Sequence, residues 1–284
     1  MQSNTRFTLA GVGLICIFGG LTGRAISQTG SANNIDDYAN AYMNVQPPNG
    51  GIDWFWVADP NTSCCILTSD TSSYTVPPPI GSPTIDGESR IFYVDWKANT
   101  LNGNPGERYS TAFGNAENAT HFVYDVYIYV KDPQNIQNIE MDTNQVWDNN
   151  GDVLIYGLQC AHGAQSWQYT ESDLNAQNPQ PKWVTPNQNW QTHLACDPQT
   201  WTANAWHHVQ LSVHRDSTGA AFYDSITFDG TTTALSGWSG NSSFPRAWSP
   251  VGNLLLNFQL DGIYNNGAEA TITAYIDKLN LSWH

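Results

Sequence analysis

The sequence predicts an all-β protein, folded as a single antiparallel β-sandwich with one curved, concave sheet. Several segments alternate strictly between apolar and polar residues, which is the period of a strand buried on one side. Turn-forming residues separate these segments, and no stretch of ten or more residues has a convincing helical period. The chain of 284 residues is long enough to bury a large core, and no linker divides it.

The alternating segments are the predicted strands. They span residues 122–131, 139–145, 153–160, 206–215, 256–261 and 271–283. In 122–131, the apolar face carries Phe122, Tyr124, Val126, Ile128 and Val130. In 271–283, the apolar series Ile272, Ala274 and Ile276 leads to Lys278, which is expected on the same face. Alternation of this kind indicates sheets that are packed on one side and solvated on the other.

The polar faces of these strands carry carboxylates, amides and rings rather than the lysines and threonines of an ordinary solvated strand. Planar amides, carboxylates and rings suit a bound sugar, so we expect a carbohydrate-binding surface on the concave sheet. Its expected residues are Asp125, Tyr127, Glu140, Asp142, Asn144, Gln159, His208, Gln210, Asn257 and Gln259. The alternative is a solvated face in a protein rich in Asn and Gln.

The first 27 residues are predicted to be a secretory signal peptide. Arg6 precedes an apolar run over residues 7–21, and Ala25-Ile26-Ser27 supplies small residues for cleavage. The alternative is a short membrane anchor, although the run is short for a membrane span. No second apolar run follows, so residues 28–284 are expected to form one secreted, periplasmic or cell-surface domain without membrane insertion.

The cysteines that remain after cleavage at Ser27 are even in number. Cys64, Cys65, Cys160 and Cys196 allow three pairings, and an even count in an exported chain favours disulfides. We expect a Cys160–Cys196 bond, because these two residues flank a Trp-rich segment that a covalent link would hold against the sheet. Cys64 and Cys65 are adjacent, and either form a strained ring or stay free. The spacing does not fit a zinc site.

Charge and aromatic content narrow the class of partner. The chain has 10 Lys+Arg against 25 Asp+Glu, a formal net charge of −15, and 12 Trp. An acidic surface repels phosphate, so nucleic acids and anionic membranes are excluded as partners. A weakly charged, polar, Trp-rich protein suits a neutral glycan. Trp183 and Trp190, flanked by Pro, Asn and Gln, are the expected stacking platforms.

Three segments resemble the concanavalin A-like lectin/glucanase superfamily, the laminin-G-like jelly rolls. These are residues 140–144 (EMDTN), residues 204–211 (NAWHHVQL) with the hairpin over 222–230, and residues 274–281 (AYIDKLNL). The resemblance covers roughly residues 122–284 and implies a jelly roll. The superfamily includes lectins, glycosidases, lyases and adhesion modules, so it specifies function poorly. Many members bind calcium, for which Asp261, near Asn265 and Asn266, is the candidate ligand here.

The segment EMDTN is similar to the E-x-D-x-E strand of glycoside hydrolase family 16. That resemblance places Glu140 as nucleophile and Asp142 as the residue that tunes protonation, but Asn144 stands where the acid/base belongs. An amide cannot donate a proton to a leaving oxygen. We therefore expect non-catalytic glycan binding and assign no catalytic residue and no other cofactor.

Two alternatives remain open. One is a glycan-cleaving enzyme that uses Glu140, Asp142 or His208 in the same surface, either as a glycoside hydrolase or as a polysaccharide lyase. The other is a surface or adhesion module without a sugar site.

Overall fold

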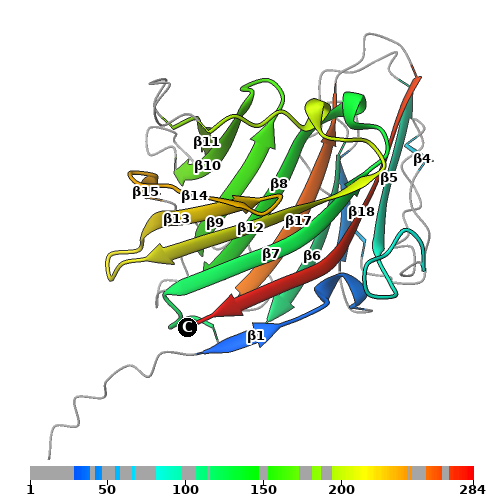
Figure 1. The fold of residues 1–284 in the computed structure, drawn as a ribbon. Helices are drawn as coiled ribbons and strands as arrows, with labels where there is room; N and C mark the ends of the chain where they lie inside the picture. The colour runs from blue at the N-terminus through cyan, green and yellow to red at the C-terminus, as the bar shows by residue number, and fades with distance from the viewer. Residues whose placement is uncertain are drawn as a thin grey trace, which may run out of the picture.

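The computed structural model describes a molecule of two stacked β-sheets (Figure 1). It describes residues 29–38, 42–46, 55–57, 66–67, 81–97, 106–113, 116–146, 153–172, 181–186, 194–241, 243–244, 254–263 and 269–284. The predicted signal peptide, Cys64, Cys65, Trp190, Asn265 and Asn266 lie outside these residues. No helix in the described part is long and apolar enough to cross a membrane.

The first sheet faces the viewer in Figure 1. Its strands, in spatial order, are β14 (Thr231–Ala234), β13 (Ala220–Phe228), β12 (Ala205–Arg215), β7 (His121–Val130), β18 (Glu269–Trp283), β5 (Arg90–Lys97) and β4 (Ile66–Leu67). In addition, β1 (Gly30–Ala32) pairs with β18, and β15 (Ser239–Asn241) pairs with β13. All these pairs are antiparallel except the β4–β5 pair, which is parallel.

The second sheet lies behind the first. Its order is β11 (Pro181–Val184), β10 (Ser166–Ser172), β9 (Val153–Ala161), β8 (Ile136–Val146), β17 (Leu254–Gly262), β6 (Gly106–Phe113), β2 (Tyr42–Gln46) and β3 (Phe55–Val57), with β16 (Ser243–Phe244) beside β9. Three short 3-10 helices are η1 (Ile35–Asp37), η2 (Pro133–Asn135) and η3 (Pro198–Thr200). The prediction of an all-β antiparallel sandwich is confirmed.

The core lies between the two sheets, as the alternation predicts. Every second residue of β7 from Phe122 to Val130 is buried, as expected, whereas every residue of β17 from Leu254 to Gly262 is buried, so the expected solvated face of β17 is wrong. Phe92 of β5 meets Phe258 of β17 edge-to-face across the sandwich, with 5.0 Å between ring centroids. The outward residues of these strands therefore belong to two different surfaces, one on each side of the core.

The last strand departs from the predicted register at one point. Its pairing with β7 shifts between Asp277 and Asn280, and Lys278 adopts a left-handed backbone with a φ of 50°. The bulge changes which side chains point inward, so Leu279 and Leu281 continue the buried series. The expectation that Lys278 shares the apolar face of Ile276 is therefore wrong.

The predicted disulfide is present. Cys160, at the end of β9, is bonded to Cys196, which precedes η3 and lies 36 residues later in the chain. The bond links the second sheet to the segment that leads into β12 of the first sheet.

Replacing Cys160 and Cys196 together by alanine is expected to lower the free energy of unfolding by about 3 kcal/mol, because the open chain gains loop entropy. Urea unfolding with and without reductant measures the change. Reductant should lower the stability of the wild-type protein and leave the double variant unaffected. Equal midpoints for the oxidised wild type and the variant would contradict the prediction.

Candidate functional site

The outward side of the second sheet carries a row of carboxylates and amides, which we call the polar face. It comprises Glu140, Asp142 and Asn144 of β8, Gln159 of β9, and Asn257 and Gln259 of β17. The strand register sets these residues side by side. Glu140 lies between Gln159 and Gln259, and Asp142 lies between Gly157 and Asn257. The prediction that Glu140, Asp142 and Asn144 share one side of a strand agrees with this register.

Most of the polar face is buried. Glu140 is 7% exposed, Asn144 5% and Gln159 3%, while Asp142 is half-buried. Polar groups removed from water need hydrogen-bond partners, because an unmet donor or acceptor loses its hydration without compensation. The buried polar atoms that have no hydrogen-bond partner therefore mark where the polar face has unused hydrogen-bonding capacity.

Two buried amide oxygens on the polar face lack a hydrogen-bond partner within the described structure. They are Oδ1 of Asn144 and Oε1 of Gln159. Asn144 is flanked on its neighbouring strands by Ile155 and Leu255, whose side chains have no donor. Gln159 uses its Nε2 to donate to Gln168, at 2.5 Å, and its oxygen accepts nothing. Both oxygens have almost no solvent-accessible surface, so a hydroxyl donor would reach them only if neighbouring side chains moved aside.

The ring of Trp183 lies at the edge of the polar face. A Cβ built on Gly157 would lie 2.5 Å from Oδ1 of Asp142 and 3.1 Å from the Trp183 ring. Only glycine allows both side chains to pack so closely against the β9 backbone. The structure thus brings the expected stacking residue next to the carboxylate, whereas Trp190 lies outside the described residues.

The neighbours of Glu140 do not supply a second acid. The residues directly opposite it on β9 and β17 are the amides Gln159 and Gln259. Retaining glycosidases need two carboxyl groups about 5–5.5 Å apart across the scissile bond, and the opposing positions on these described strands offer none. Asn144 occupies the third position of β8, so the described strands hold Glu140 and Asp142 as the carboxylates of this strand's outward side.

Asp261 extends the polar face towards the end of β17. Its carboxylate accepts hydrogen bonds from Nε2 of Gln259, at 3.1 Å, and from Nδ2 of Asn138, at 3.4 Å. No group of three or more metal-ligating side chains with suitable placement occurs in the described residues. Calcium binding at Asp261 stays a prediction.

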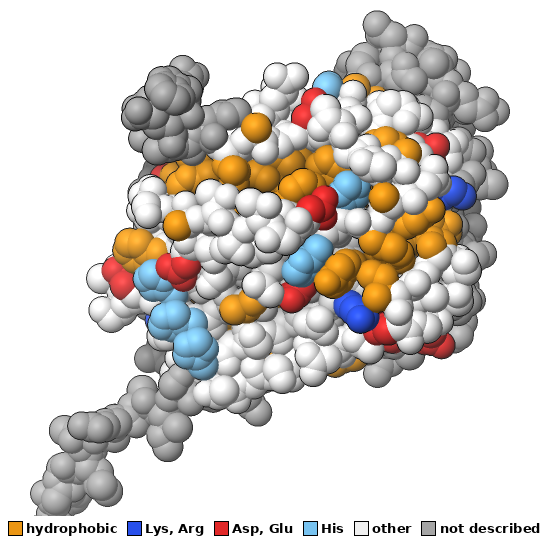
Figure 2. Space-filling view, in the orientation of Figure 1, with side chains coloured by type: hydrophobic (Ala, Val, Ile, Leu, Met, Phe, Trp, Pro, Cys, Tyr) orange, Lys and Arg blue, Asp and Glu red, His pale blue; other side chains and the backbone are white. Residues whose placement is uncertain are grey.

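The other four expected site residues lie on the opposite side of the molecule. Asp125 and Tyr127 belong to β7, and His208 and Gln210 belong to β12, which places them on the outward side of the first sheet. Figure 2 views this side, where histidine and acidic side chains are spread among polar ones. The prediction of one surface shared by all ten strand residues is therefore wrong. Alternation identifies outward positions but not the sheet to which a strand belongs.

The first-sheet residues satisfy one another. Nε2 of His208 lies 2.8 Å from Oδ1 of Asp125, and Nε2 of Gln210 donates to Oδ2 of the same carboxylate at 2.8 Å. The Tyr127 and His208 rings stack with centroids 4.4 Å apart. This closed arrangement leaves fewer unmet groups for a ligand than the polar face does.

Sequence reasoning missed two residues that complete the polar face, Gln168 and Gly157. Gln168 bridges Gln159 and the hydroxyl of Thr185, to which its Nε2 donates at 2.6 Å. Gln168 lies between two buried aromatic residues, Trp167 and Tyr169. This alternation of apolar and polar residues was the signal of a short strand. Nothing in the sequence around Gly157 marked it as the point where Trp183 approaches the sheet.

Comparison with known proteins finds solved structures whose fold is similar to that of this chain. No family model matches the chain, and no curated protein matches its sequence. Among solved structures, arcelin-5, a lectin-like defence protein from Phaseolus vulgaris, matches at 8% identity over 90% of this chain and 98% of its own, with a TM-score of 0.43.

Two further structures match at a similar level. A glycoside hydrolase family 16 protein of the mixed-linkage glucan PUL of Bacteroides ovatus, in complex with a product, matches at 9% identity over 89% of this chain and 99% of its own, with a TM-score of 0.45. The family 7 alginate lyase A1-II′ matches at 11% identity over 89% of this chain and 99% of its own, with a TM-score of 0.39.

The fold is a β-sandwich of the jelly-roll type. Its two facing antiparallel sheets establish this, as the resemblance to concanavalin A-like proteins implied. The comparisons concern the fold alone, so inferences about the chemistry of the polar face rest on the residues of this chain.

Proposed function

We propose that the protein is a non-catalytic carbohydrate-binding protein that holds a neutral glycan against the polar face. The observation that carries the proposal is the row of carboxylates and amides side by side on β8, β9 and β17, with the Trp183 ring beside Asp142. Within this row, the buried amide oxygens of Asn144 and Gln159 lack a partner in the described structure. Each represents a free-energy cost of about 1–3 kcal/mol that a hydroxyl donor would remove. Glycans present hydroxyl groups at the density that a row of amides and carboxylates requires.

The charge of the face supports a neutral ligand. Glu140 and Asp142 accept hydrogen bonds from hydroxyls, whereas a uronate would bring a third carboxylate to them. No Lys or Arg belongs to the polar face, and the formal net charge of the chain is −15. Both features disfavour an anionic glycan. The Trp183 ring, beside Asp142, adds an apolar surface for the C–H groups of a sugar ring.

Asn144→Leu provides the direct test. It is expected to weaken glycan binding about tenfold, and to leave the free energy of unfolding unchanged or raise it by up to about 1 kcal/mol, because it removes a buried oxygen without a partner. Affinity electrophoresis against mixed-linkage glucan, laminarin, xylan, mannan and starch measures binding, and urea unfolding measures stability.

The matched control is Gln210→Leu, an amide on the outward side of the first sheet, which should leave binding unchanged. Release of reducing or unsaturated ends that disappears in Glu140→Gln would replace the binding proposal with an enzyme. Absence of retention on every glycan would favour the adhesion module instead.

A further inference from the structure

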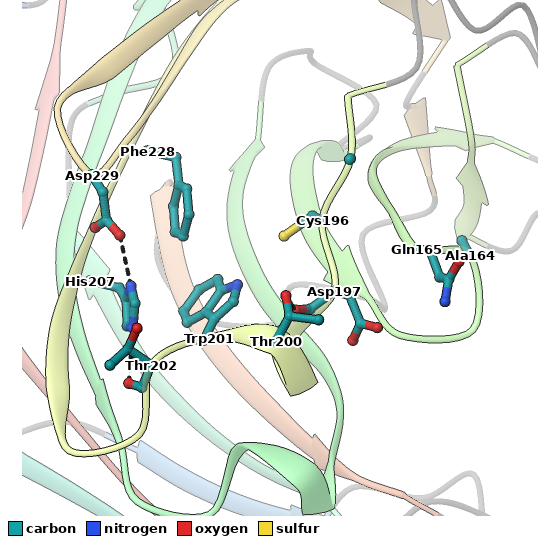
Figure 3. A pocket seen from close by; sticks show the side chains of 11 residues that line it. Ala164, Gln165, Cys196, Asp197, Thr200, Trp201, Thr202, His207, Phe228 and Asp229 are labelled. Atoms are coloured by element: carbon teal, nitrogen blue, oxygen red, sulfur yellow. Dashed lines mark hydrogen bonds and ion pairs between the residues drawn. The ribbon is translucent and has the colours of Figure 1, made fainter.

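A pocket with a volume of about 660 Å³ opens near one end of the sandwich, and its lining shares no residue with the polar face (Figure 3). The turn between β9 and β10, the segment around η3, the start of β12 and the end of β13 contribute its walls. Its volume falls within the range of about 300–1,000 Å³ that is usual for small-molecule sites. None of its lining residues was among the expected site residues.

The walls of the pocket are held in place covalently and by hydrogen bonds. Asp197 caps η3, since its Oδ1 accepts from the backbone N–H of Gln199 at 2.9 Å and also lies 3.0 Å from Nδ1 of His162. The neighbouring Cys196 is fixed by its disulfide to Cys160 and by a backbone hydrogen bond to Gln165. A pocket built this way exists before a ligand arrives, so binding does not have to order it.

Aromatic rings form one wall. Trp201 packs against Phe228 and His207, with ring centroids 5.1 and 4.9 Å apart. Figure 3 shows the indole nitrogen of Trp201 turned towards Cys196 across the pocket. The indole N–H makes no hydrogen bond to the part of the chain that the structure describes, so it is available as a donor.

The histidine in this wall is already engaged. Nδ1 of His207 lies 2.8 Å from Oδ2 of Asp229, and Nε2 lies 3.2 Å from the carbonyl oxygen of Thr202. Both ring nitrogens face acceptors, so His207 fixes the wall and does not serve as a base towards the pocket. Asp229 also receives the backbone N–H of His208 at its other oxygen.

The chemistry of the lining selects the class of ligand. Among the residues that the structure describes, the lining contains two carboxylates, Asp197 and Asp229, together with threonine hydroxyls and the side chain of Gln165, but no Lys or Arg. The carboxylates Asp197 and Asp229 would repel an anion. A neutral ring that carries hydroxyls would place C–H groups against Trp201, accept from the indole N–H and donate to Asp197.

We propose that this pocket binds a single neutral sugar residue, at a site separate from the polar face. A pocket at the end of the sandwich accommodates the end of a glycan chain, whereas an extended polar face accommodates its length. Two sites on one chain would raise the apparent affinity for a polymer above that of either site alone, because the second contact is made at high effective concentration.

The test follows the indole signals of ¹⁵N-labelled protein during titration with glucose, galactose, mannose, xylose and N-acetylglucosamine. The Trp201 signal is assigned as the one absent from Trp201→Phe. We expect at least one sugar to shift it saturably. Asp197→Asn, which retains an oxygen to cap η3, should weaken that binding about tenfold.

Two control variants separate the pocket from other effects. Asp224→Asn alters a carboxylate that bonds His214 on the first sheet, and should leave the Trp201 titration unchanged. Asn144→Leu should also leave it unchanged, so failure of the polar-face proposal would not affect the pocket result. The pocket proposal is overturned if no sugar shifts the signal, if Asp197→Asn binds as well as wild type, or if tetramethylammonium shifts it and the sugars do not.

Discussion

Replacing Gln145 by leucine is expected to lower the free energy of unfolding by about 4 kcal/mol. Its fully buried amide joins one loop, between β6 and β7, to two strands, β9 and β12. Nε2 donates to the carbonyl oxygens of Ala116 and Ala119 at 2.7 and 2.8 Å, and Oε1 accepts from the Tyr156 hydroxyl at 2.8 Å and from Nε of Arg215 at 3.0 Å. Leucine fills the space but leaves all four groups without this partner.

The measurement is urea unfolding of Gln145→Leu beside Asn144→Leu. The two variants make the same chemical change at adjacent positions of β8, one pointing into the core and the other onto the polar face. Because the Asn144 oxygen has no partner to lose, its variant should be as stable as the wild type or more so. Equal losses in the two variants would contradict the hydrogen-bond account and indicate a general intolerance of β8.

The second large effect is a dependence of stability on pH that originates at Asp36 in η1. Burial raises the pKa of this carboxyl from 3.8 to about 7, opposed by a hydrogen bond from the Leu279 N–H and reinforced by the nearby carboxylates of Asp37 and Asp277. The folded state therefore holds this proton more tightly than the unfolded state between about pH 4 and pH 7. Its contribution to stability rises as pH falls through this window, by about 4 kcal/mol in total.

Asp36→Asn should remove most of this slope, because the amide stays neutral at every pH and its oxygen can still accept from Leu279. Urea unfolding at pH 5 and pH 8 gives the slope for both proteins. His121 works in the opposite direction, since burial and the nearby His284 and His214 lower its pKa, and comparing the two proteins cancels its effect. A wild type whose stability rises from pH 5 to pH 8 relative to the variant would refute the assignment.

The sequence was sufficient to predict the strands β7, β8, β9, β12, β17 and β18, but it did not identify others such as β5, β6 and β10. In β7, alternation alone separates Phe122 from Asp125, because this strand is buried on one side, whereas in β17 both Phe258 and Asn257 are buried. The Cys160–Cys196 bond was also predictable from its position around a Trp-rich segment. These features depend on local pattern, which a single sequence contains.

The composition of the candidate site was only half predictable. Glu140 and His208 both occupy outward positions, yet β8 and β12 belong to different sheets, and strand order is a property of the whole chain. The bulge before Asn280 and the packing of Trp183 at Gly157 depend on tertiary contacts as well. The end pocket was missed because Trp201 and Asp197 lie in a connecting segment without a regular period.

The pairing of β1 with β18 has a consequence for how the chain reaches its structure. Gly30 lies opposite Trp283, so close that a Cβ at position 30 would meet the indole ring at 2.5 Å. This edge of the first sheet cannot be completed until residues 281–283 are present, about 250 residues after β1. Together with the β5–β18 pairing, it makes the fold rich in contacts between distant segments, which predicts slow folding.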